Sequence, residues 1–221
     1  QERKDLESTK KALADYYKSL ELAPNSSYSV NAKLQIAMLL YDFASIPDGI
    51  RMCEQVIASE PGNREALMLL GDLHRSPFNE GKSDRFLLAL AAYKRALETG
   101  PCEASVKAMI WGQVSLTFFG MGRKEIATSY ARQARLIAGD TKIGTYFKVV
   151  RESLTKYFPQ EDQKPASLSE EPWNEPLVLP DVDMKAGTIH VVYGGKEETI
   201  NVATISKPAP QRWLHTPSLK L

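Results

Sequence analysis

The stretch from Ala108 to Gly139 limits the possible folds of this chain more than any other part of the sequence. Its first half carries apolar and small residues at helical spacing, Gly122 then interrupts the pattern, and a stripe of alanines follows at the same spacing. The residues of the two stripes are Trp111, Val114, Ser115 and Phe118, then Ala127, Ala131 and Ala134. Two helices approach closely only where the side chains between them are short, so Ser115 and Ala127 predict the crossing of a tight helix pair.

This order of large, small and aromatic residues, a turn glycine and small residues again resembles the tetratricopeptide repeat, a helix–turn–helix unit of about 34 residues. The resemblance implies an all-α fold, a right-handed α-solenoid of antiparallel helix pairs whose inner wall is lined by the first helix of each pair. It also implies a protein-interaction scaffold rather than an enzyme. Some members of the family bind chaperone tails through a lysine, asparagine and arginine clamp, which this chain lacks, so that activity is not expected here.

Other segments repeat the pattern with departures, and together they predict a helical repeat domain over residues 1–158. In Val30–Pro61, Ala44 stands where the turn glycine is usual. In Arg64–Pro101, the loop-like Ser76–Ser83 makes the unit longer; it is either a binding feature or a harmless insertion. Glu2–Leu22 resembles a second helix without its first, so either an array begins before it or it serves as a cap. Ile143–Phe158 has the apolar stripe and charged face of a capping helix.

Residues 159–221 differ in composition and predict an extended, proline-rich arm. Two strand-like runs within residues 188–205 flank Gly194-Gly195 and indicate a β-hairpin, whose glycines suit a turn with positive φ. Two strands alone are marginally stable in water, so we expect the arm to be ordered by docking, either on the helical domain or on a second protein. Large apolar residues in and beside the hairpin are the expected anchors: Trp173, Val191, Tyr193 and Trp213.

A peptide-binding groove is the site that the repeat resemblance implies. Its wall would be formed by the inward positions of the first helices, which are mostly apolar and include three methionines, a residue that suits an adaptable surface. Those positions are Leu34, Met38, Tyr41, Met68, Asp72, Arg75, Met109, Leu116 and Phe119. The alternative is that these side chains only pack between neighbouring helices. The expected partner is a protein or peptide within a multiprotein assembly.

Charge suggests a second kind of partner. The net charge is only +1, but residues 123–158 contain eight basic and three acidic side chains. A basic helical face could bind nucleic acid, although it lacks the interleaved aromatics of single-strand binders, and the acidic segment at 160–183 offers a simpler partner for it. A nucleic-acid-associated factor is therefore the alternative function.

The remaining motifs favour neither catalysis nor a cofactor. Cys53 falls at a core position and Cys102 near a helix start, and the pair has no metal-ligand spacing. The three histidines are dispersed, and no glycine-rich phosphate loop occurs. We therefore expect no catalytic residues, no metal and no cofactor. No run of 18 apolar residues occurs, so we expect no membrane span. The two cysteines fit a reducing, cytoplasmic compartment, and an envelope or secreted location is the alternative.

Overall fold

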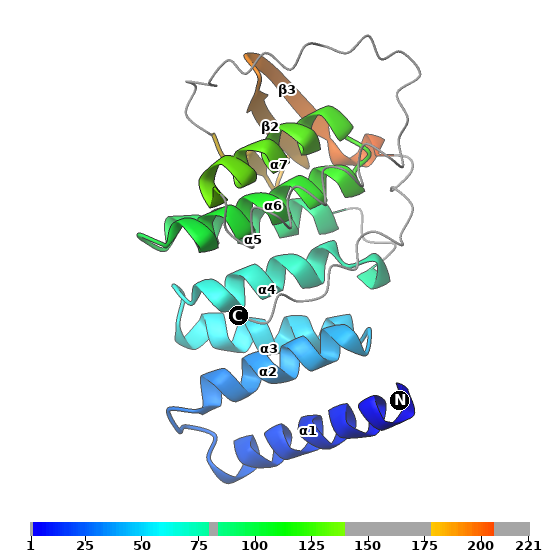
Figure 1. Ribbon diagram of the computed structural model, residues 1–221, viewed down its shortest axis with the longest axis vertical. Helices are drawn as coiled ribbons and strands as arrows, with labels where there is room; N and C mark the ends of the chain where they lie inside the picture. Colours follow the sequence, from blue (N-terminus) through cyan, green and yellow to red (C-terminus); the bar gives the residue numbers. More distant parts are fainter. Residues whose placement is uncertain (1, 80–83, 140–177, 206–221) are drawn as a thin grey trace. The chain divides into compact units, whose positions relative to one another are not determined.

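The computed structural model describes residues 2–79, 84–139 and 178–205, and within them the chain is mostly helical with a small antiparallel sheet (Figure 1). The helical elements are α1 (Glu2–Leu22), α2 (Ser29–Asp42), α3 (Ile46–Ser59), α4 (Arg64–Arg75), the short 3₁₀ turn η1 (Pro77–Asn79), α5 (Arg85–Glu98), α6 (Ala104–Gly120) and α7 (Lys124–Ala138). The strands are β1 (Asp181–Asp183), β2 (Thr188–Tyr193) and β3 (Lys196–Asn201), followed by the 3₁₀ turn η2 (Val202–Thr204). The expected fold class, helix pairs followed by an arm with a β-hairpin, is confirmed.

The described residues form two compact units, divided between Thr99 and Gly100. In the first unit each helix from α1 to α5 packs on the next, and α2 also packs on α4. Ile36, Cys53 and Leu73 are fully or almost fully removed from solvent in its core. α1 adds partly buried side chains to this core, among them Leu13 and Leu20.

The turns after α2 and α6 have the same backbone hydrogen bonds, which helps to explain why both segments form helix pairs. Ala44 and Gly122 occupy equivalent positions with φ of 57° and 75°. Each turn closes with the paired bonds of a Schellman motif, in which a residue with positive φ satisfies the last helical carbonyls. The bonds are Ala44 N–Tyr41 O and Ser45 N–Leu40 O in one turn, and Gly122 N–Phe119 O and Arg123 N–Phe118 O in the other. The alanine in place of the usual glycine therefore takes the glycine conformation.

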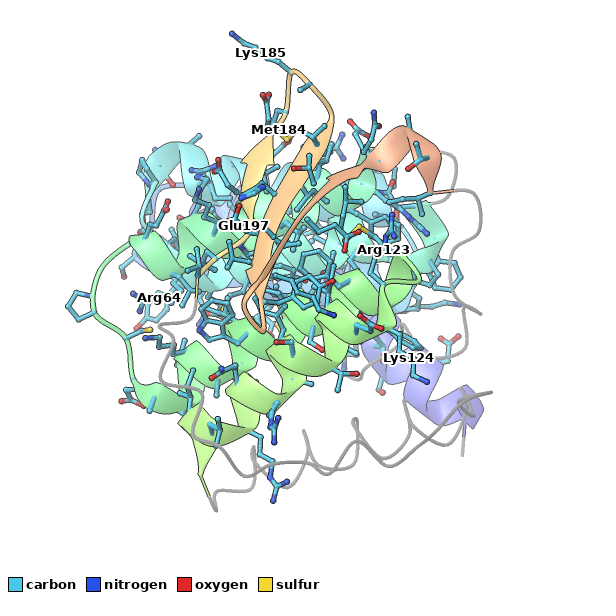
Figure 2. All side chains as sticks on the ribbon, turned by 90° about the horizontal axis from the view of Figure 1, so that it is seen from above. Arg64, Arg123, Lys124, Met184, Lys185 and Glu197 are labelled. Carbon is cyan, nitrogen blue, oxygen red and sulfur yellow. The ribbon has the colours of Figure 1, made fainter. Side chains whose placement is uncertain are left out.

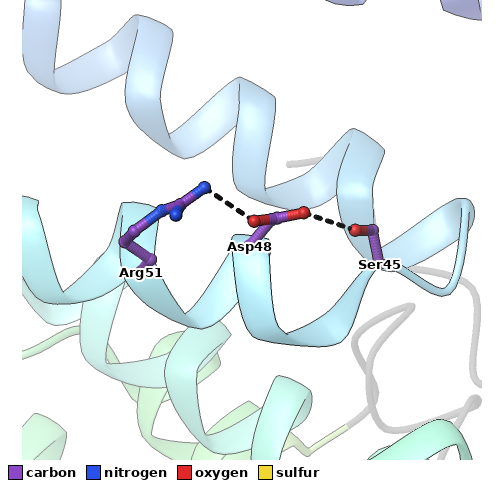
Figure 3. Close-up of polar contacts among 3 residues, drawn as sticks. All are labelled: Ser45, Asp48 and Arg51. Carbon is purple, nitrogen blue, oxygen red and sulfur yellow. Dashed lines mark hydrogen bonds and ion pairs between the residues drawn. The ribbon is translucent and has the colours of Figure 1, made fainter.

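Polar side chains mark the starts of α3 and α4. Asp48, in the first turn of α3, accepts hydrogen bonds from Ser45 Oγ at 2.8 Å and Arg51 Nη2 at 2.6 Å (Figure 3). Its negative charge is favourable at this end of the helix dipole. Asn63 caps α4, because its side chain accepts from the backbone N–H of Ala66 at 2.9 Å.

The predicted insertion between α4 and α5 folds partly back onto its own helix ends. Pro77 and Asn79 are buried, and Asn79 Nδ2 donates to the carbonyl of His74 at 3.2 Å. Arg85 donates to the carbonyl of Ser76 at 3.2 Å. Residues 80–83 of this loop lie outside the described residues.

The second unit contains α6, α7 and the sheet. The predicted crossing is present: Ser115 Oγ donates to the carbonyl of Ala127 at 2.6 Å, and both residues are buried. β2 pairs antiparallel with β1 and with β3, so the sheet has one strand more than the expected hairpin. Gly194 and Gly195 form the hairpin turn with φ of 54° and 71°, as expected.

One face of the sheet is buried. Ile189 and Val191 of β2 are almost fully removed from solvent, as is Ile200 of β3, while the intervening His190 and Thr199 are exposed. This alternation is that of a sheet with one apolar face on a core and one face in water. The predicted capping helix at 143–158 lies outside the described residues.

Candidate peptide-binding wall on helices α2 and α4

The positions predicted for a groove wall differ in how far they are exposed. Six are buried, and three are partly exposed and could touch a ligand. The buried six are Leu34, Tyr41, Arg75, Met109, Leu116 and Phe119; the partly exposed three are Met38, Met68 and Asp72. All three partly exposed residues belong to α2 and α4. The candidate site is therefore the side of these two packed helices that carries Met38, Met68 and Asp72, referred to below as the α2–α4 wall.

Helical spacing and the shared influence on one pKa indicate how Met38, Met68 and Asp72 are arranged. Met68 and Asp72 are four residues apart on α4, and therefore lie on the same face of the helix. On α2, Met38 lies one turn before Tyr41, whose pKa is raised by burial and is further affected by Arg75 and Asp72. Tyr41 thus lies beside the Asp72–Arg75 pair.

Asp72 is the polar centre of the wall. Tyr93 donates its hydroxyl to Asp72 Oδ1 at 2.6 Å, and Arg75 Nη2 lies 3.6 Å from the same oxygen. The Arg75 side chain is 1% exposed, whereas a quarter of the Asp72 side chain (25%) is exposed. Two buried side chains therefore contact Oδ1, while the Asp72 side chain as a whole is partly exposed.

A glycine places the tyrosine that holds this carboxylate. A Cβ atom added to Gly71 would lie 2.4 Å from Tyr93 Cε1 and 2.7 Å from Cζ, so the ring occupies the space that any other residue would fill. Glycine at this position of α4 costs helix propensity but lets the Tyr93 ring lie against the helix backbone. Helical spacing in the sequence does not indicate this link between Gly71, Tyr93 and Asp72.

Burial and neighbouring charges oppose each other at Asp72. Burial raises the pKa of Asp72 above its ordinary value, although the Arg75 charge and the hydrogen bonds from Tyr93 and Arg75 offset part of this rise. Burial also lowers the pKa of Arg75, but Tyr93 and Asp72 outweigh it, and the net pKa lies above the ordinary value. A buried ion pair of this kind does little for stability on its own, but removing one partner is costly because the other charge is left uncompensated. Removing Asp72 or Arg75 alone should therefore destabilise the chain.

Cys53 lies in the core, as its position in the sequence predicted. Cys53 is buried, and burial raises the pKa of its thiol to about 12, with smaller contributions from Asp72 and Glu54. A thiol that stays protonated in this way is inert. Cys102 is partly exposed in the loop before α6.

The described part of the arm contacts α7 and the residue before it in the same chain. Tyr130 donates its hydroxyl to the carbonyl of Val178 at 3.1 Å, and Arg123 Nη1 lies 3.4 Å from Glu198 Oε1. Tyr193 donates to the other oxygen of Glu198 at 3.1 Å. In Figure 2, Arg123 and Lys124 lie at the start of α7, and Lys185 extends outward from the turn between β1 and β2.

Some arm anchors were predicted and others were missed. Val191 is buried and Tyr193 partly buried, whereas Trp173 and Trp213 lie outside the described residues. Tyr130, which stacks between Trp111 and Phe118 with ring centroids 5.5 and 5.3 Å apart, was not predicted as an anchor. The sequence did indicate this role, because Tyr130 is a large residue beside an otherwise alanine-rich stripe.

Of the basic segment proposed for nucleic acid, the part beyond residue 139 also lies outside the described residues.

Comparison of the chain with protein-family models and with curated proteins finds no match. Within the ranges 2–79, 84–139 and 178–205, no group of His, Cys, Asp or Glu side chains has the arrangement of a metal site. In the same part of the chain, every helix is too short or too polar to cross a membrane.

Proposed function

We propose that this chain is a non-enzymatic interaction scaffold with tetratricopeptide-like repeats, and that it binds a peptide segment of another protein on the α2–α4 wall. The observation that carries this proposal is the combination of partly exposed Met38 and Met68 with the rigidly held carboxylate of Asp72. Such a surface provides apolar contact area together with one fixed polar group, which is the usual composition of a recognition site.

Repeat membership is supported by two features. The turns after α2 and α6 share the same hydrogen bonds, and small residues lie close together in the α2–α3 and α6–α7 pairs. A Cβ atom added to Gly49 would lie 3.4 Å from the carbonyl of Ala37, and the corresponding pair in the second unit is Ala127 and Ser115. Since these features follow from how helices pack, they favour a repeat scaffold without naming a partner.

The experiment is selection from a library of random 12-residue peptides displayed on phage, with the full chain as bait. We expect the wild type to enrich peptides and the double variant Met38→Gln, Met68→Gln to lose that enrichment, because both thioethers leave the wall while helix propensity is kept. Leu22 and Tyr28 are exposed in the same unit, at 77% and 78%, so Leu22→Gln, Tyr28→Gln is the matched control and should enrich as wild type does. Absence of enrichment by the wild type, or equal enrichment by the Met variant, would contradict the proposed site.

A further inference from the structure

We propose that the acidic segment at residues 160–177 binds Arg132 and Arg135 on α7 of the same chain, and that this contact keeps the two arginines from nucleic acid and other polyanions. The acidic segment lies outside the described residues, so the inference is carried by α7, by the fixed ends of the connection and by charge. It concerns a surface other than the α2–α4 wall and does not depend on the proposed function.

The second half of α7 carries positive charge without an acidic residue beside it on the helix. From Ala131 to Ala138 the helix contains two arginines and no acidic residue. Arg135 is exposed and Arg132 is partly exposed, and because they are three residues apart they lie on one face of the helix. Within the described ranges, neither arginine takes part in an ion pair.

The charged residues nearby leave this positive charge uncompensated. Burial and Glu198 raise the pKa of Tyr193 most, and Glu125 adds to this rise, so Glu125 lies near the sheet at the start of α7. Glu103 and Lys107, at the start of α6, have opposite charges. In residues 100–139 as a whole there are five basic side chains and two acidic ones. The helix pair is therefore positively charged, and its positive end is the second half of α7.

The connection that contains the acidic segment is attached to α7 at both ends. It begins at residue 140, directly after Gly139, and it ends before Val178, whose carbonyl accepts from Tyr130 Oη at 3.1 Å in the middle of α7. A chain spans at most about 3.6 Å per residue, so Glu171 lies within about 25 Å of Val178. The 15 residues of α7 are about 22 Å long, so this reach covers the whole helix.

The charges of the acidic segment are opposite to those of α7. Residues 160–177 contain five acidic side chains and one lysine, and three of the acids lie within eight residues of Val178. The attachment holds them near α7 at an effective concentration on the order of millimolar, whereas a polyanion must arrive from solution. Each exposed ion pair contributes little and is screened by salt, so the contact is one that a strong polyanion or high salt displaces.

The first experiment is elution of full-length variants from a heparin column in a salt gradient, with heparin as the polyanion. The acid variant removes three negative charges from the segment: Glu170→Gln, Glu171→Gln and Glu175→Gln. The control variant removes the same charge from exposed positions on α1, α3 and α4: Glu21→Gln, Glu54→Gln and Glu65→Gln. We expect the acid variant to elute at higher salt than the control variant, because the arginines of α7 are released.

Adding Arg132→Gln and Arg135→Gln to both variants should abolish this difference. A difference that persists without the arginines would place the effect elsewhere and overturn the inference. Equal elution of the acid and control variants would also overturn it, because α7 would then be equally open to a polyanion with and without the acids.

Cross-linking tests the contact directly. Arg132→Lys keeps the charge and supplies an amine that a carbodiimide can join to a carboxylate in ion-pair contact with it. We expect mass spectrometry of the monomer to find this amine joined to residues 160–177 at low salt, and the cross-link to be lost at 1 M salt, where the Debye length is about 3 Å. Lys10 and Glu7, 3.5 Å apart on α1, are the internal control for the reagent at low salt. A cross-link within the control pair but none to residues 160–177 would overturn the inference.

Discussion

Replacing Gly71 with alanine should destabilise the chain, although alanine is the better helix former. Propensity alone favours alanine by about 0.8–1.0 kcal/mol. Against this, the new Cβ would lie 2.4 Å from the Tyr93 ring, and overpacking of this kind costs about 1–3 kcal/mol. If the ring moves, the hydrogen bond from Tyr93 to the Asp72 carboxylate is lost, which costs about 1.5–3 kcal/mol for a charged partner. The net loss of unfolding free energy is therefore about 2–5 kcal/mol.

The assay is urea unfolding followed by circular dichroism, with a double-mutant cycle as the control. In a Tyr93→Leu background the ring and its hydroxyl are absent, so Gly71→Ala should become neutral or stabilise by up to about 1 kcal/mol. The sign of the Gly71→Ala effect should thus depend on residue 93. The reasoning is refuted if Gly71→Ala destabilises both backgrounds equally, or leaves the unfolding free energy of the wild type unchanged.

Three further predictions concern packing, turns and thiols. Ala127→Leu should lower the unfolding free energy by about 1–3 kcal/mol, because the new side chain overpacks the crossing at Ser115; an unchanged melting temperature would contradict the crossing. Both turns need a residue with positive φ, so Ala44→Gly should raise the unfolding free energy by up to about 1 kcal/mol and Gly122→Ala should lower it by a similar amount. A change of the same sign in both variants would contradict this reasoning. In native protein, iodoacetamide should modify Cys102 but not Cys53, as read by mass spectrometry. Burial raises the pKa of the Cys53 thiol from 9.0 to about 12, so the folded state keeps this proton at pH values where the unfolded state loses it. The resulting contribution of Cys53 to the unfolding free energy is present below about pH 9 and is lost as the pH rises toward 12. A Cys53→Ala variant should lack this part of the pH dependence.

The sequence by itself determined the helix pairs and the hairpin of β2 and β3, because local signals agree at these positions, whereas β1 was not predicted. Helical spacing of apolar residues and glycines at the turns act over a few residues, and both appear as predicted. Ser115 and Ala127 could be paired from the sequence because short side chains at helical spacing allow only one close approach. Ala44 shows the limit of such patterns, since its turn forms with the glycine conformation and an alanine in place.

Only the tertiary structure decided which residues of the predicted wall are exposed and what holds them. Inward spacing on a helix does not distinguish a buried side chain from one that lines a surface, because burial depends on neighbouring helices; Tyr41 and Arg75 are buried while Met38 and Met68 are partly exposed. The link from Gly71 to Tyr93 to Asp72 joins residues of two helices, and the hydrogen bond of Tyr130 to Val178 spans 48 positions. Contacts of this kind leave no periodic trace in a sequence, because they depend on where helix pairs place side chains in space.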